Sequence, residues 1–334
     1  MIDSIVISSR VRLARNIYDL PFPNKLCDFE SALGVSKAIF EILGEDYEYR
    51  RLKNLTNNQC LMLLEQRDIS KELIGNKDIS GYAKSGDGQI TIMINEEDHL
   101  REQCILKGFE LKKCYEKLNV IDNQILDNID IAFSSKLGFL TACPTNVGTG
   151  MRASVMLFLP ALTFNGSIKQ LMESLEQNGL TVRGLFGEGS SCDGYFYQVS
   201  NKYTLGLSEQ DILNLVEKHI KIIIEMEEKA RKTLLSVNES VIMDMCYRAY
   251  GVLTNSYVLS VNECIELLSK LRFGVVLNLF KFRNASIIDE LYTSVQPAHL
   301  MDYYNLDLSP KEQDIFRAKF VGESLENKLI KGVR

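Results

Sequence analysis

The second half of the chain contains almost nothing that would interrupt a helix. Proline, the residue that most strongly ends helices, is absent from Ala161 through Gln296. From Ser208 onward, apolar residues recur at helical spacing, as at Ile212 and Val216. Residues 1 to about 205 differ, because short apolar or alternating runs there are separated by glycine-rich turns. This change of pattern predicts an α+β domain followed by a helical region.

Three segments carry the signature of a helix start. Ser236-Val-Asn-Glu239 and Ser260-Val-Asn-Glu263 place a serine three residues before a glutamate, so each side chain can satisfy a free amide at the start of a helix. Ser309-Pro310-Lys-Glu312 adds proline at the first helical position. We therefore predict two domains, residues 1–234 with mixed structure and residues 235–334 with helical structure.

Composition argues against several classes of protein. The formal net charge of −6 gives no broad basic surface, so direct binding to nucleic acid is not expected. No apolar run reaches the roughly 20 residues needed to cross a bilayer, and the first four residues do not resemble a secretory signal. The cysteines and histidines show no CxxC and no zinc-like spacing. We expect a cytoplasmic protein without membrane contact and without a metal site formed by its own side chains.

Four stretches of the chain concentrate charge, and each contains arginine. The stretch NEEDHLR, which ends at Arg101, directly follows the apolar run QITIMI. The other three are SSRVRLAR from Ser8, CPTNVGTGMRAS from Cys143 and RGLFGEGS from Arg183. The crowding of opposite charges at the end of an apolar strand calls for a functional explanation.

The arginines in these stretches predict binding of an anion. Alternation along a strand places Arg10 and Arg12 on one face and Val11 on the other. Glycines around Arg152 and Arg183 allow the backbone to approach a ligand closely, as a phosphate-binding loop requires. The chain has no GxxxxGK[ST] and neither HRD nor DFG, which excludes a P-loop and the usual protein-kinase machinery.

Together and in this order, the four stretches resemble the catalytic domain of the ATP:guanidino phosphotransferase (phosphagen kinase) family. Members carry an S-[TS]-R-V-R strand, NEEDH-[LI]-R, CPTN-x-GT-x-[ML]-R-A-S and R-G-x-x-GE. The resemblance spans residues 8 to about 208 and includes NKYTLGLSE from Asn201 to Glu209. It implies an α+β fold in which an antiparallel sheet is flanked by helices. An all-helical C-terminal domain, of the type that dimerises and binds phosphoarginine, is expected to follow.

The resemblance implies that Glu97 and Glu188 are catalytic. A guanidinium stays protonated in water and is a poor nucleophile. Two carboxylates that hold its nitrogens can orient one nitrogen towards the γ-phosphoryl group and accept its proton. Cys143 would lie beside the guanidinium, where neighbouring cations would lower the pKa of the thiol and make it reactive.

The nucleotide implied by the resemblance is Mg-ATP, with Mg²⁺ held through the phosphates and not by protein ligands. Arginines around the triphosphate would neutralise charge on the equatorial oxygens, where phosphoryl transfer needs stabilisation. The residues that the resemblance assigns to nucleotide binding are Ser8, Ser9, Arg10, Val11, Arg12, Arg101, Arg152, Ala153, Ser154, Val155, Met156, Arg183, Gly184, Leu185, Phe186, Gly187 and Glu188.

The order of segments is similar to that of the bacterial protein-arginine kinases, a branch that phosphorylates arginine side chains within proteins. Creatine and arginine kinases carry a helical domain before the S-R-V-R strand, whereas this strand begins here at residue 8 and the helical segment follows. The branch implies protein substrates bearing arginine, their marking for Clp-type proteolysis and a part in the stress response. Its implied partners are a McsA activator, a CtsR-type repressor and the ClpC/ClpP protease, and a homodimer is expected.

Two other interpretations stay open. One is a phosphagen kinase that acts on a free guanidino compound, which the absence of a leading helical domain disfavours. The other is a nucleotide-binding adaptor with little catalysis, which the presence of Glu97, Glu188 and the arginines disfavours.

The sequence departs from the family at three places. Relatives in the branch run further before the S-R-V-R strand, so we expect an N-terminal packing segment to be missing. Where the family has a histidine near the nucleotide, in EKHLIS, this chain has Arg67. The phosphoarginine-binding motif R-D-x-x-R-A is represented by Gln313, Asp314 and Arg317. Because glutamine cannot offer a charged fork to phosphate, we predict weak or absent phosphoarginine binding there.

Overall fold

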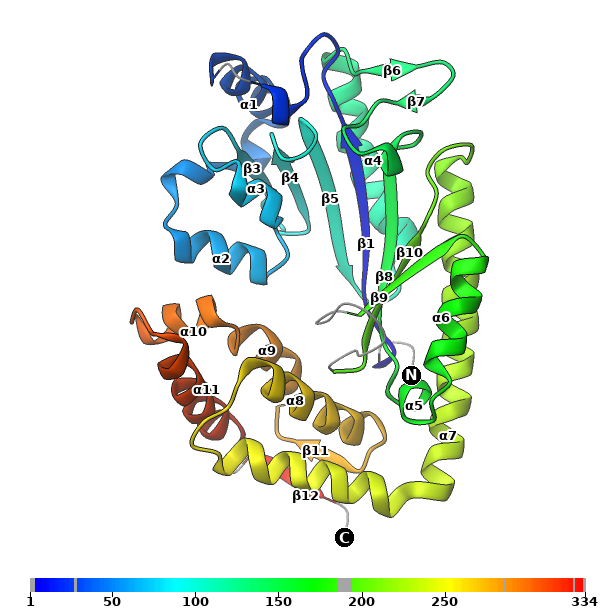
Figure 1. The fold of residues 1–334 in the computed structure, drawn as a ribbon, viewed down its shortest axis with the longest axis vertical. Helices are drawn as coiled ribbons and strands as arrows, with labels where there is room; N and C mark the ends of the chain where they lie inside the picture. The colour runs from blue at the N-terminus through cyan, green and yellow to red at the C-terminus, as the bar shows by residue number, and fades with distance from the viewer. Residues whose placement is uncertain (1–3, 27–28, 185–193, 285, 327, 333–334) are drawn as a thin grey trace. The chain divides into compact units, whose positions relative to one another are not determined.

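The computed structural model describes residues 4–26, 29–184, 194–284, 286–326 and 328–332. Its main element is an eight-stranded sheet (Figure 1). In order across the sheet, the strands are β2 (Tyr47–Arg51), β3 (Gly81–Ser85), β4 (Ile90–Ile94), β5 (Leu100–Lys107), β1 (Val6–Arg15), β8 (Met151–Phe158), β10 (Phe196–Asn201) and β9 (Leu180–Gly184).

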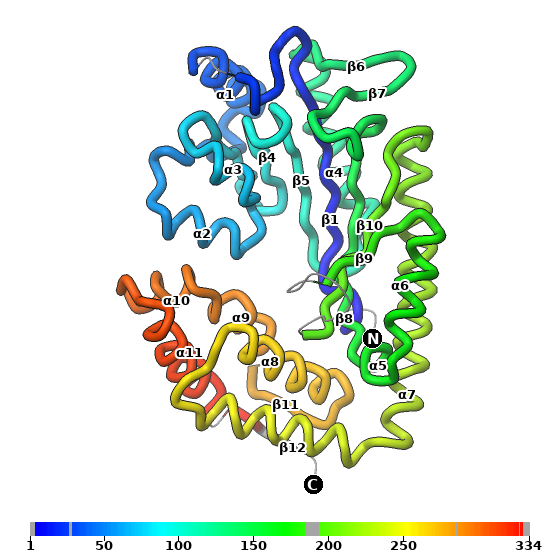
Figure 2. Tube along the Cα trace, viewed as in Figure 1, coloured from blue at the N-terminus to red at the C-terminus, as the bar shows by residue number. Residues whose placement is uncertain are grey.

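The first strand of the chain lies in the interior of this sheet, between β5 and β8, as the trace in Figure 2 also shows. The pairs β2/β3, β3/β4, β4/β5, β5/β1 and β1/β8 are antiparallel. The predicted antiparallel sheet is therefore confirmed. A small hairpin, β6 (Phe133–Ser134) with β7 (Gly138–Phe139), pairs outside the main sheet.

Helices flank the sheet, as predicted. They are α1 (Phe29–Leu43), α2 (Asn57–Glu65), α3 (Lys71–Gly75), α4 (Leu111–Asn128), α5 (Pro160–Phe164) and α6 (Ile168–Gln177), with 3-10 turns η2 (Pro23–Lys25), η3 (Gly44–Asp46), η4 (Leu52–Asn54) and η5 (Pro144–Asn146). Helix α4 packs on β1 and β5. On this face, Ser9 O accepts a hydrogen bond from Cys114 Sγ at 3.4 Å, and Arg15 Nη2 lies 2.7 Å from Asp122 Oδ2.

Alternation along β1 separates its residues into two sets. Val11 and Leu13, which are 0% and 1% exposed, belong to the set that faces α4 together with Ser9 and Arg15. Arg10 and Arg12 are half-buried and belong to the other face. The predicted separation of these two arginines from Val11 is confirmed.

The region after residue 208 is mainly helical, as predicted. It contains α7 (Glu209–Asn255), α8 (Val261–Val276), α9 (Ile287–Ser294), α10 (Pro297–Tyr304) and α11 (Pro310–Leu325). It also contains one element that the sequence pattern did not indicate, an antiparallel pair of β11 (Phe280–Phe282) and β12 (Leu329–Gly332). This ribbon is short and its two strands are distant in sequence, so it leaves little local periodicity.

Two of the three predicted helix starts are confirmed. Ser260 caps α8 by accepting from Glu263 N, and Ser309 forms a capping box with Glu312 at the start of α11. Ser236 itself does not cap a helix, because its hydroxyl donates to Thr233 O instead. The helical run nevertheless breaks close to the predicted start: at Asn238, two residues further on, φ is −127° and ψ is 25°, and two helices meet there within α7.

The chain divides into two compact units that each combine separate segments. One contains Met1–Leu157, Met172–Val182 and Gln198–Ile222, and the other contains Phe158–Leu171, Arg183–Tyr197 and Ile223–Arg334. The proposed domains 1–234 and 235–334 follow the order of motifs and stay a prediction.

Candidate active site

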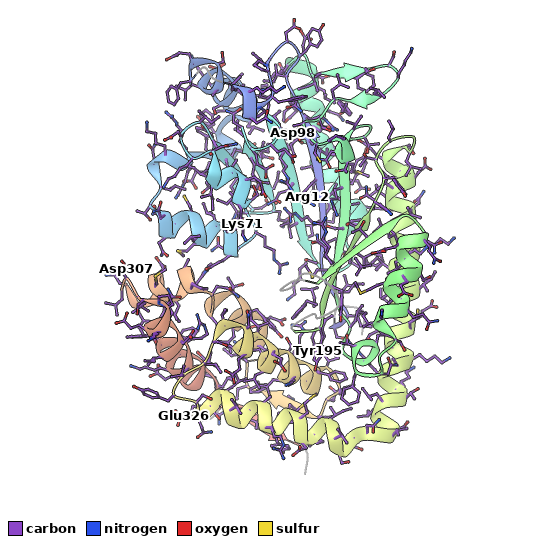
Figure 3. All side chains as sticks on the ribbon, viewed as in Figure 1. Arg12, Lys71, Asp98, Tyr195, Asp307 and Glu326 are labelled. Atoms are coloured by element: carbon purple, nitrogen blue, oxygen red, sulfur yellow. The ribbon has the colours of Figure 1, made fainter. Side chains whose placement is uncertain are left out.

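Four arginines lie on one face of three adjacent strands, β5, β1 and β8. Arg12 is directly opposite Arg152 of β8, and Arg101 of β5 is directly opposite Ala14 of β1. Residues opposite each other in an antiparallel pair point to the same side of the sheet. Arg10, Arg12, Arg101 and Arg152 therefore share one side, which we call the arginine face. Figure 3 labels Arg12 within the sheet.

Burial and the charges of neighbouring arginines both act on Arg10 and Arg12 of the arginine face. Burial, followed by the charges of Arg101 and Arg67, lowers the pKa of Arg10 to about 9. Burial and the neighbouring arginines also hold the pKa of Arg12 well below its usual value. In the described part of the chain, Nε of both Arg10 and Arg12 is buried without a hydrogen-bond partner. A bound polyphosphate would supply hydrogen-bond acceptors for these two groups and negative charge beside them.

The hydrogen-bond partners of these arginines differ in charge. Arg101 forms an ion pair with Glu96, which is 1% exposed. Arg152 Nη2 donates to Ser200 Oγ at 3.0 Å, and Arg10 Nη2 donates to Gln103 Oε1. Two of the four arginines thus have a neutral group among their hydrogen-bond partners.

The turn between β4 and β5 gives its three acids different environments. Glu96 and Asp98 are 1% and 2% exposed, whereas Glu97 between them is exposed. Glu96 accepts from Ser70 Oγ in addition to Arg101, and Asp98 Oδ1 accepts from Asn16 Nδ2 at 2.6 Å. The crowded charges therefore have two uses: Glu96 and Asp98 fix the turn, and Glu97 is presented at its tip.

A left-handed residue begins this turn. Asn95 has φ 58°, a conformation that asparagine tolerates better than most residues. Its side-chain amide donates to Ala32 O at 3.0 Å and to Ile79 O at 3.1 Å. His99 N donates to Asn16 Oδ1 at 2.9 Å and closes the other end. The tip that bears Glu97 is therefore held from both sides.

The pKa of Glu97 is raised above its usual value. The first cause is partial desolvation, and the second is the charge of Asp98, followed by that of Glu96. A carboxylate whose pKa moves towards working pH becomes a better proton acceptor. The environment of Glu97 therefore suits the predicted role as a base.

Asp98 also joins this turn to the segment that carries Cys143. Its Oδ1 accepts from Ala142 N at 2.7 Å, so Cys143 follows directly after a contact with the turn of Glu97. Cys143 is half-buried, and its Sγ lies 3.0 Å from Thr145 Oγ1. The structure thus brings together two of the sequence stretches that were singled out for chemistry.

The other residues predicted to bind nucleotide fall on both sides of the sheet. Ser154 and Met156 lie opposite Arg10 and Ser8 in register, so these residues share the arginine face. Register places the side chains of Ser9, Val11, Ala153 and Val155 on the face towards α4, away from the arginine face. Arg183 is exposed on β9 and Gly184 ends that strand. Leu185, Phe186, Gly187 and Glu188 lie outside the described residues.

Three residues near the arginines were not predicted from the sequence. Glu96 and Ser70 orient Arg101, and Gln103 contacts Arg10. Gln103 could have been found, because it lies two residues after Arg101 on the same strand and alternation places both on one face. Ser70 carries no comparable signal, since only the tertiary fold brings α3 to the turn.

Arg67, at the position of the family histidine, lies close enough to the arginine face to affect it. It adopts φ 66°, and its charge contributes to the lowered pKa of Arg10. Burial lowers the pKa of Arg67 itself. It is therefore a further cation beside the arginine face.

Neither a metal site nor a membrane span is found in the described part of the chain. No group of three or more His, Cys, Asp or Glu residues there could hold a metal ion. No helix among the described residues is long and apolar enough to cross a bilayer.

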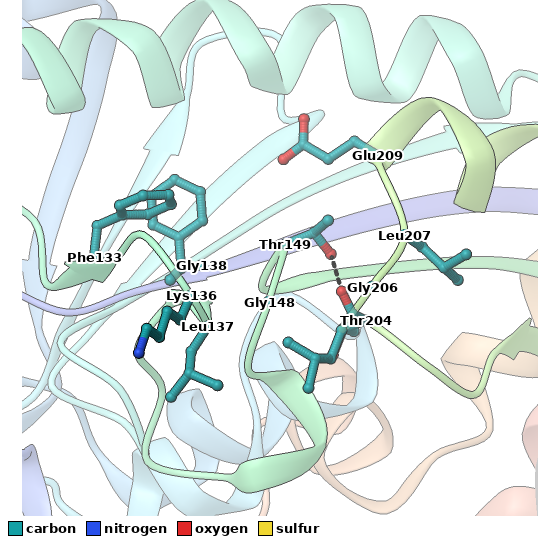
Figure 4. A pocket seen from close by; sticks show the side chains of 12 residues that line it. Phe133, Lys136, Leu137, Gly138, Gly148, Thr149, Thr204, Gly206, Leu207 and Glu209 are labelled. Atoms are coloured by element: carbon teal, nitrogen blue, oxygen red, sulfur yellow. Dashed lines mark hydrogen bonds between the residues drawn. The ribbon is translucent and has the colours of Figure 1, made fainter.

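A pocket beside the β6–β7 hairpin is separate from the arginine face (Figure 4). Its lining includes Phe139, Thr149, Thr204 and Glu209 but none of the four arginines. The ring of Phe139 also contacts Arg15, whose Cζ lies 3.6 Å from the ring centroid. The pocket is therefore not the site that the arginines predict.

The predicted phosphoarginine site lies on α11, and the arginine of that site, Arg317, is already hydrogen-bonded within the protein. Arg317 is 1% exposed, and it donates from Nε to Val295 O at 2.8 Å and from Nη1 to Leu259 O at 2.9 Å. It also pairs with Asp314 at 2.5 Å. Gln313 Nε2 donates to Leu308 O at 3.0 Å. These contacts give Arg317 a structural role between helices.

Comparison with known proteins gives matches along almost the whole chain. A family model described as the ATP:guanido phosphotransferase C-terminal catalytic domain matches residues 34–230. A second, described as the protein-arginine kinase McsB C-terminal domain, matches residues 239–331.

Proteins and structures of similar sequence agree with these matches. The chain is 42% identical to the protein-arginine kinase of Clostridium acetobutylicum, over 97% of this chain and 96% of that protein. It is 42% identical to the protein-arginine kinase of Clostridium kluyveri, over 96% and 94%. Among solved structures, that of a lombricine kinase is similar with a TM-score of 0.59 at 29% identity, covering 68% of this chain and 67% of the other.

Proposed function

The chain belongs to the ATP:guanido phosphotransferases and, among them, to the protein-arginine kinases, and we propose that its acceptors are arginine side chains within proteins. It is an ATP-dependent guanidino phosphotransferase. The observation that most supports a reaction at the predicted site is the arginine face, four cations beside the turn that presents Glu97. The match of residues 239–331 to the C-terminal domain of these kinases supports a protein acceptor.

In the proposed reaction, a guanidino nitrogen forms a bond to the γ-phosphorus of ATP. The bond from that phosphorus to the oxygen bridging to the β-phosphorus breaks, and ADP leaves. The attacking nitrogen loses one proton, which Glu97 accepts; its raised pKa favours this transfer. Glu188 is the second proposed carboxylate, and Cys143 is proposed to lie beside the acceptor.

Arg10, Arg12, Arg101 and Arg152 would hold the triphosphate, with Arg183 as a fifth proposed ligand. Hydrogen bonds that are already aimed at the phosphate oxygens stabilise charge as it spreads in the transition state. Mg²⁺ bound through the phosphates would neutralise part of the same charge. Ser8, Ser154 and Met156 share this face and are proposed to border the nucleotide.

Further partners follow from the family and stay proposals. They are a McsA activator, a CtsR-type repressor as substrate, the ClpC/ClpP protease that receives the marked protein, and a second copy of the chain. We place the reaction in the cytoplasm, where ATP is available and where the six described cysteines, all free, would stay reduced. Light scattering of the purified protein tests the dimer, because a monomeric mass at micromolar concentration would contradict it.

A choice between acceptors tests the proposal. The protein would be incubated with Mg²⁺ and ATP labelled at the γ-phosphorus, with free arginine in one sample and an unfolded protein in another. We expect label on the unfolded protein and none on the same protein with its arginines replaced by lysine. Label on free arginine alone would indicate a small-molecule kinase, and ATP binding without transfer would indicate an adaptor.

A further inference from the structure

Gln103 is buried among the strands that carry the arginine face. On β5 it pairs in register with Arg12 of β1 on one side and with Thr91 of β4 on the other. Its side chain therefore points to the same side of the sheet as Arg12. The residue is only 1% exposed, so the contacts of its amide group are made within the protein.

The amide of Gln103 makes three hydrogen bonds. Nε2 donates to Arg67 O at 2.9 Å and to Asp68 O at 3.0 Å, and Oε1 accepts from Arg10 Nη2. The chemistry of the neighbours allows only this orientation of the amide. In the reverse orientation, Oε1 would face two carbonyl oxygens and the amide nitrogen would face a guanidinium.

The turn that Gln103 holds is one that needs support. Arg67 has φ 66°, in a region that side chains other than glycine, asparagine and aspartate seldom adopt. A second contact holds the same turn, since Asp68 Oδ2 lies 2.5 Å from Lys84 Nζ of β3. The turn is thus fastened over the sheet, and Arg67 is kept near Arg10.

The neutrality of the amide matters for an anion site. Glu96 orients Arg101 but also cancels its charge, whereas Gln103 orients Arg10 without adding an opposite charge. A carboxylate in this position would compete with phosphate for Arg10 and would oppose two carbonyl oxygens.

We propose that Gln103 is a positioning residue of the nucleotide site, whose neutral amide holds the Arg10 guanidinium and the Arg67 turn in the arrangement that binds phosphate. Gln103 acts through Arg10 and Arg67 and does not itself take part in the transfer. The inference rests on the proposed function for the identity of the ligand. It can nevertheless be tested by binding alone.

The test compares Gln103→Leu and Gln103→Glu with the control Thr91→Val, a buried neighbour in the same cross-strand row. Affinity for Mg-ATP is measured by calorimetry without acceptor, and the melting temperature is recorded for each variant. A hydrogen bond to a charged group is lost in Gln103→Leu, so its dissociation constant should rise about tenfold or more. It should rise further in Gln103→Glu, and Thr91→Val should stay within about twofold of the wild type.

Kinetics provide the second measurement. The KM for ATP should rise in both Gln103 variants while the KM for the protein acceptor stays unchanged, a split that a general loss of stability would not produce. Gln103→Glu is nearly isosteric and keeps the test valid if Gln103→Leu does not fold. If both Gln103 variants bind Mg-ATP as tightly as Thr91→Val does, the inference is overturned. A different result would separate the two proposals. If the Gln103 variants bind Mg-ATP weakly, and the wild type binds it tightly but transfers no phosphoryl group, the inference is supported and the proposed function is contradicted.

Discussion

At the scale of single residues, Glu97 is the acid in its turn that is free to reach a substrate. Glu96 and Asp98 are buried and hydrogen-bonded, and Glu97 is exposed with a raised pKa. Glu97→Gln should therefore lower phosphorylation by about 10² to 10⁴, because a positioned base contributes that much. The melting temperature and the affinity for ATP should hardly change.

The matched control for this variant is Glu72→Gln. Glu72 is exposed on α3, and its charge acts on Glu97 in the folded protein. The control therefore makes the same change of charge nearby without removing the base, and it should retain activity. Similar turnover in the two variants, measured with labelled ATP, would remove Glu97 from its role.

Arg152 tests whether the geometry of the arginine face matters beyond its charge. Arg152→Lys keeps the charge but loses the planar fork and the bond to Ser200. Activity should fall severely, with the roughly 10³ to 10⁵ known for arginine fingers as an upper limit. Arg50→Lys, at an exposed arginine of β2, is the control. Equal rates for both variants would show that charge alone is sufficient.

The sequence predicted some of this site and not the rest, for physical reasons. Strand alternation was enough to separate Arg10 and Arg12 from Val11, since the period of two is set by the backbone. It could not show that Glu96 is buried against Arg101 and Ser70, because only the tertiary fold brings Ser70, the N-cap of α3, to this turn. The four residues from Leu185 to Glu188 keep only the support of the family resemblance.

At the scale of elements, the two SVNE segments show the limit of local signals. Ser260 caps a helix, whereas Ser236, with the same three following residues, caps none, and the helical run breaks at Asn238 within that segment. A cap contributes only about 1 kcal/mol. Leu234 before the break and Ile242 after it are 6% and 0% exposed, and the burial of such side chains outweighs a cap.

The packing of β5 on α4 predicts a dependence of stability on pH. Burial, then the charge of Asp122, holds the pKa of Glu102 well above its usual value. When the pKa of an acid is higher in the folded than in the unfolded state, its protonation stabilises the fold. This stabilisation is fully present below the pKa of the unfolded chain, roughly 4.3. The stabilisation is lost as the pH rises through the pKa of Glu102 in the folded protein. Glu102→Gln, which stays neutral, should lose less stability than the wild type as the pH rises.

Thermal unfolding from acid to mildly alkaline pH measures this difference. The melting temperatures of the wild type and Glu102→Gln should be close near the unfolded pKa. At higher pH, the melting temperature of Glu102→Gln should exceed that of the wild type by about 2 °C or more. This is the shift in melting temperature that roughly 1 kcal/mol gives in a chain of this size. A difference that does not depend on pH would mean that Glu102 does not take up its proton on folding.

Helix α11 predicts how the enzyme responds to phosphoarginine. Arg317 is committed to Val295 O and Leu259 O, and Gln313 offers no charge. Calorimetry with free phosphoarginine should therefore detect weak binding or none. Gln313→Arg should tighten binding by about tenfold or more, since charge-assisted bonds contribute roughly 1.5 to 3 kcal/mol.

Gln313→Lys is the control for charge without a fork, and it should tighten binding less. If the wild type binds phosphoarginine tightly and both variants bind it equally well, then phosphoarginine binding does not depend on position 313.

At the scale of the whole molecule, the site depends on pairing between distant parts of the chain. The arginine face forms because β1, from the start of the chain, lies between β5 and β8. No local pattern specifies that order, and the family resemblance predicted which arginines meet without showing how. The same holds for the bond from Asp98 to Ala142, which joins the turn of Glu97 to the segment of Cys143.

The central claim is that this site forms a bond between phosphorus and a guanidino nitrogen. The most direct measurement is the phosphorus NMR spectrum of an unfolded protein substrate after incubation with the enzyme and Mg-ATP. We predict a phosphoramidate signal that disappears in acid, absent with Glu97→Gln and present with Glu72→Gln. Phosphate esters on hydroxyl side chains, or release of inorganic phosphate with no bond to nitrogen, would contradict the claim.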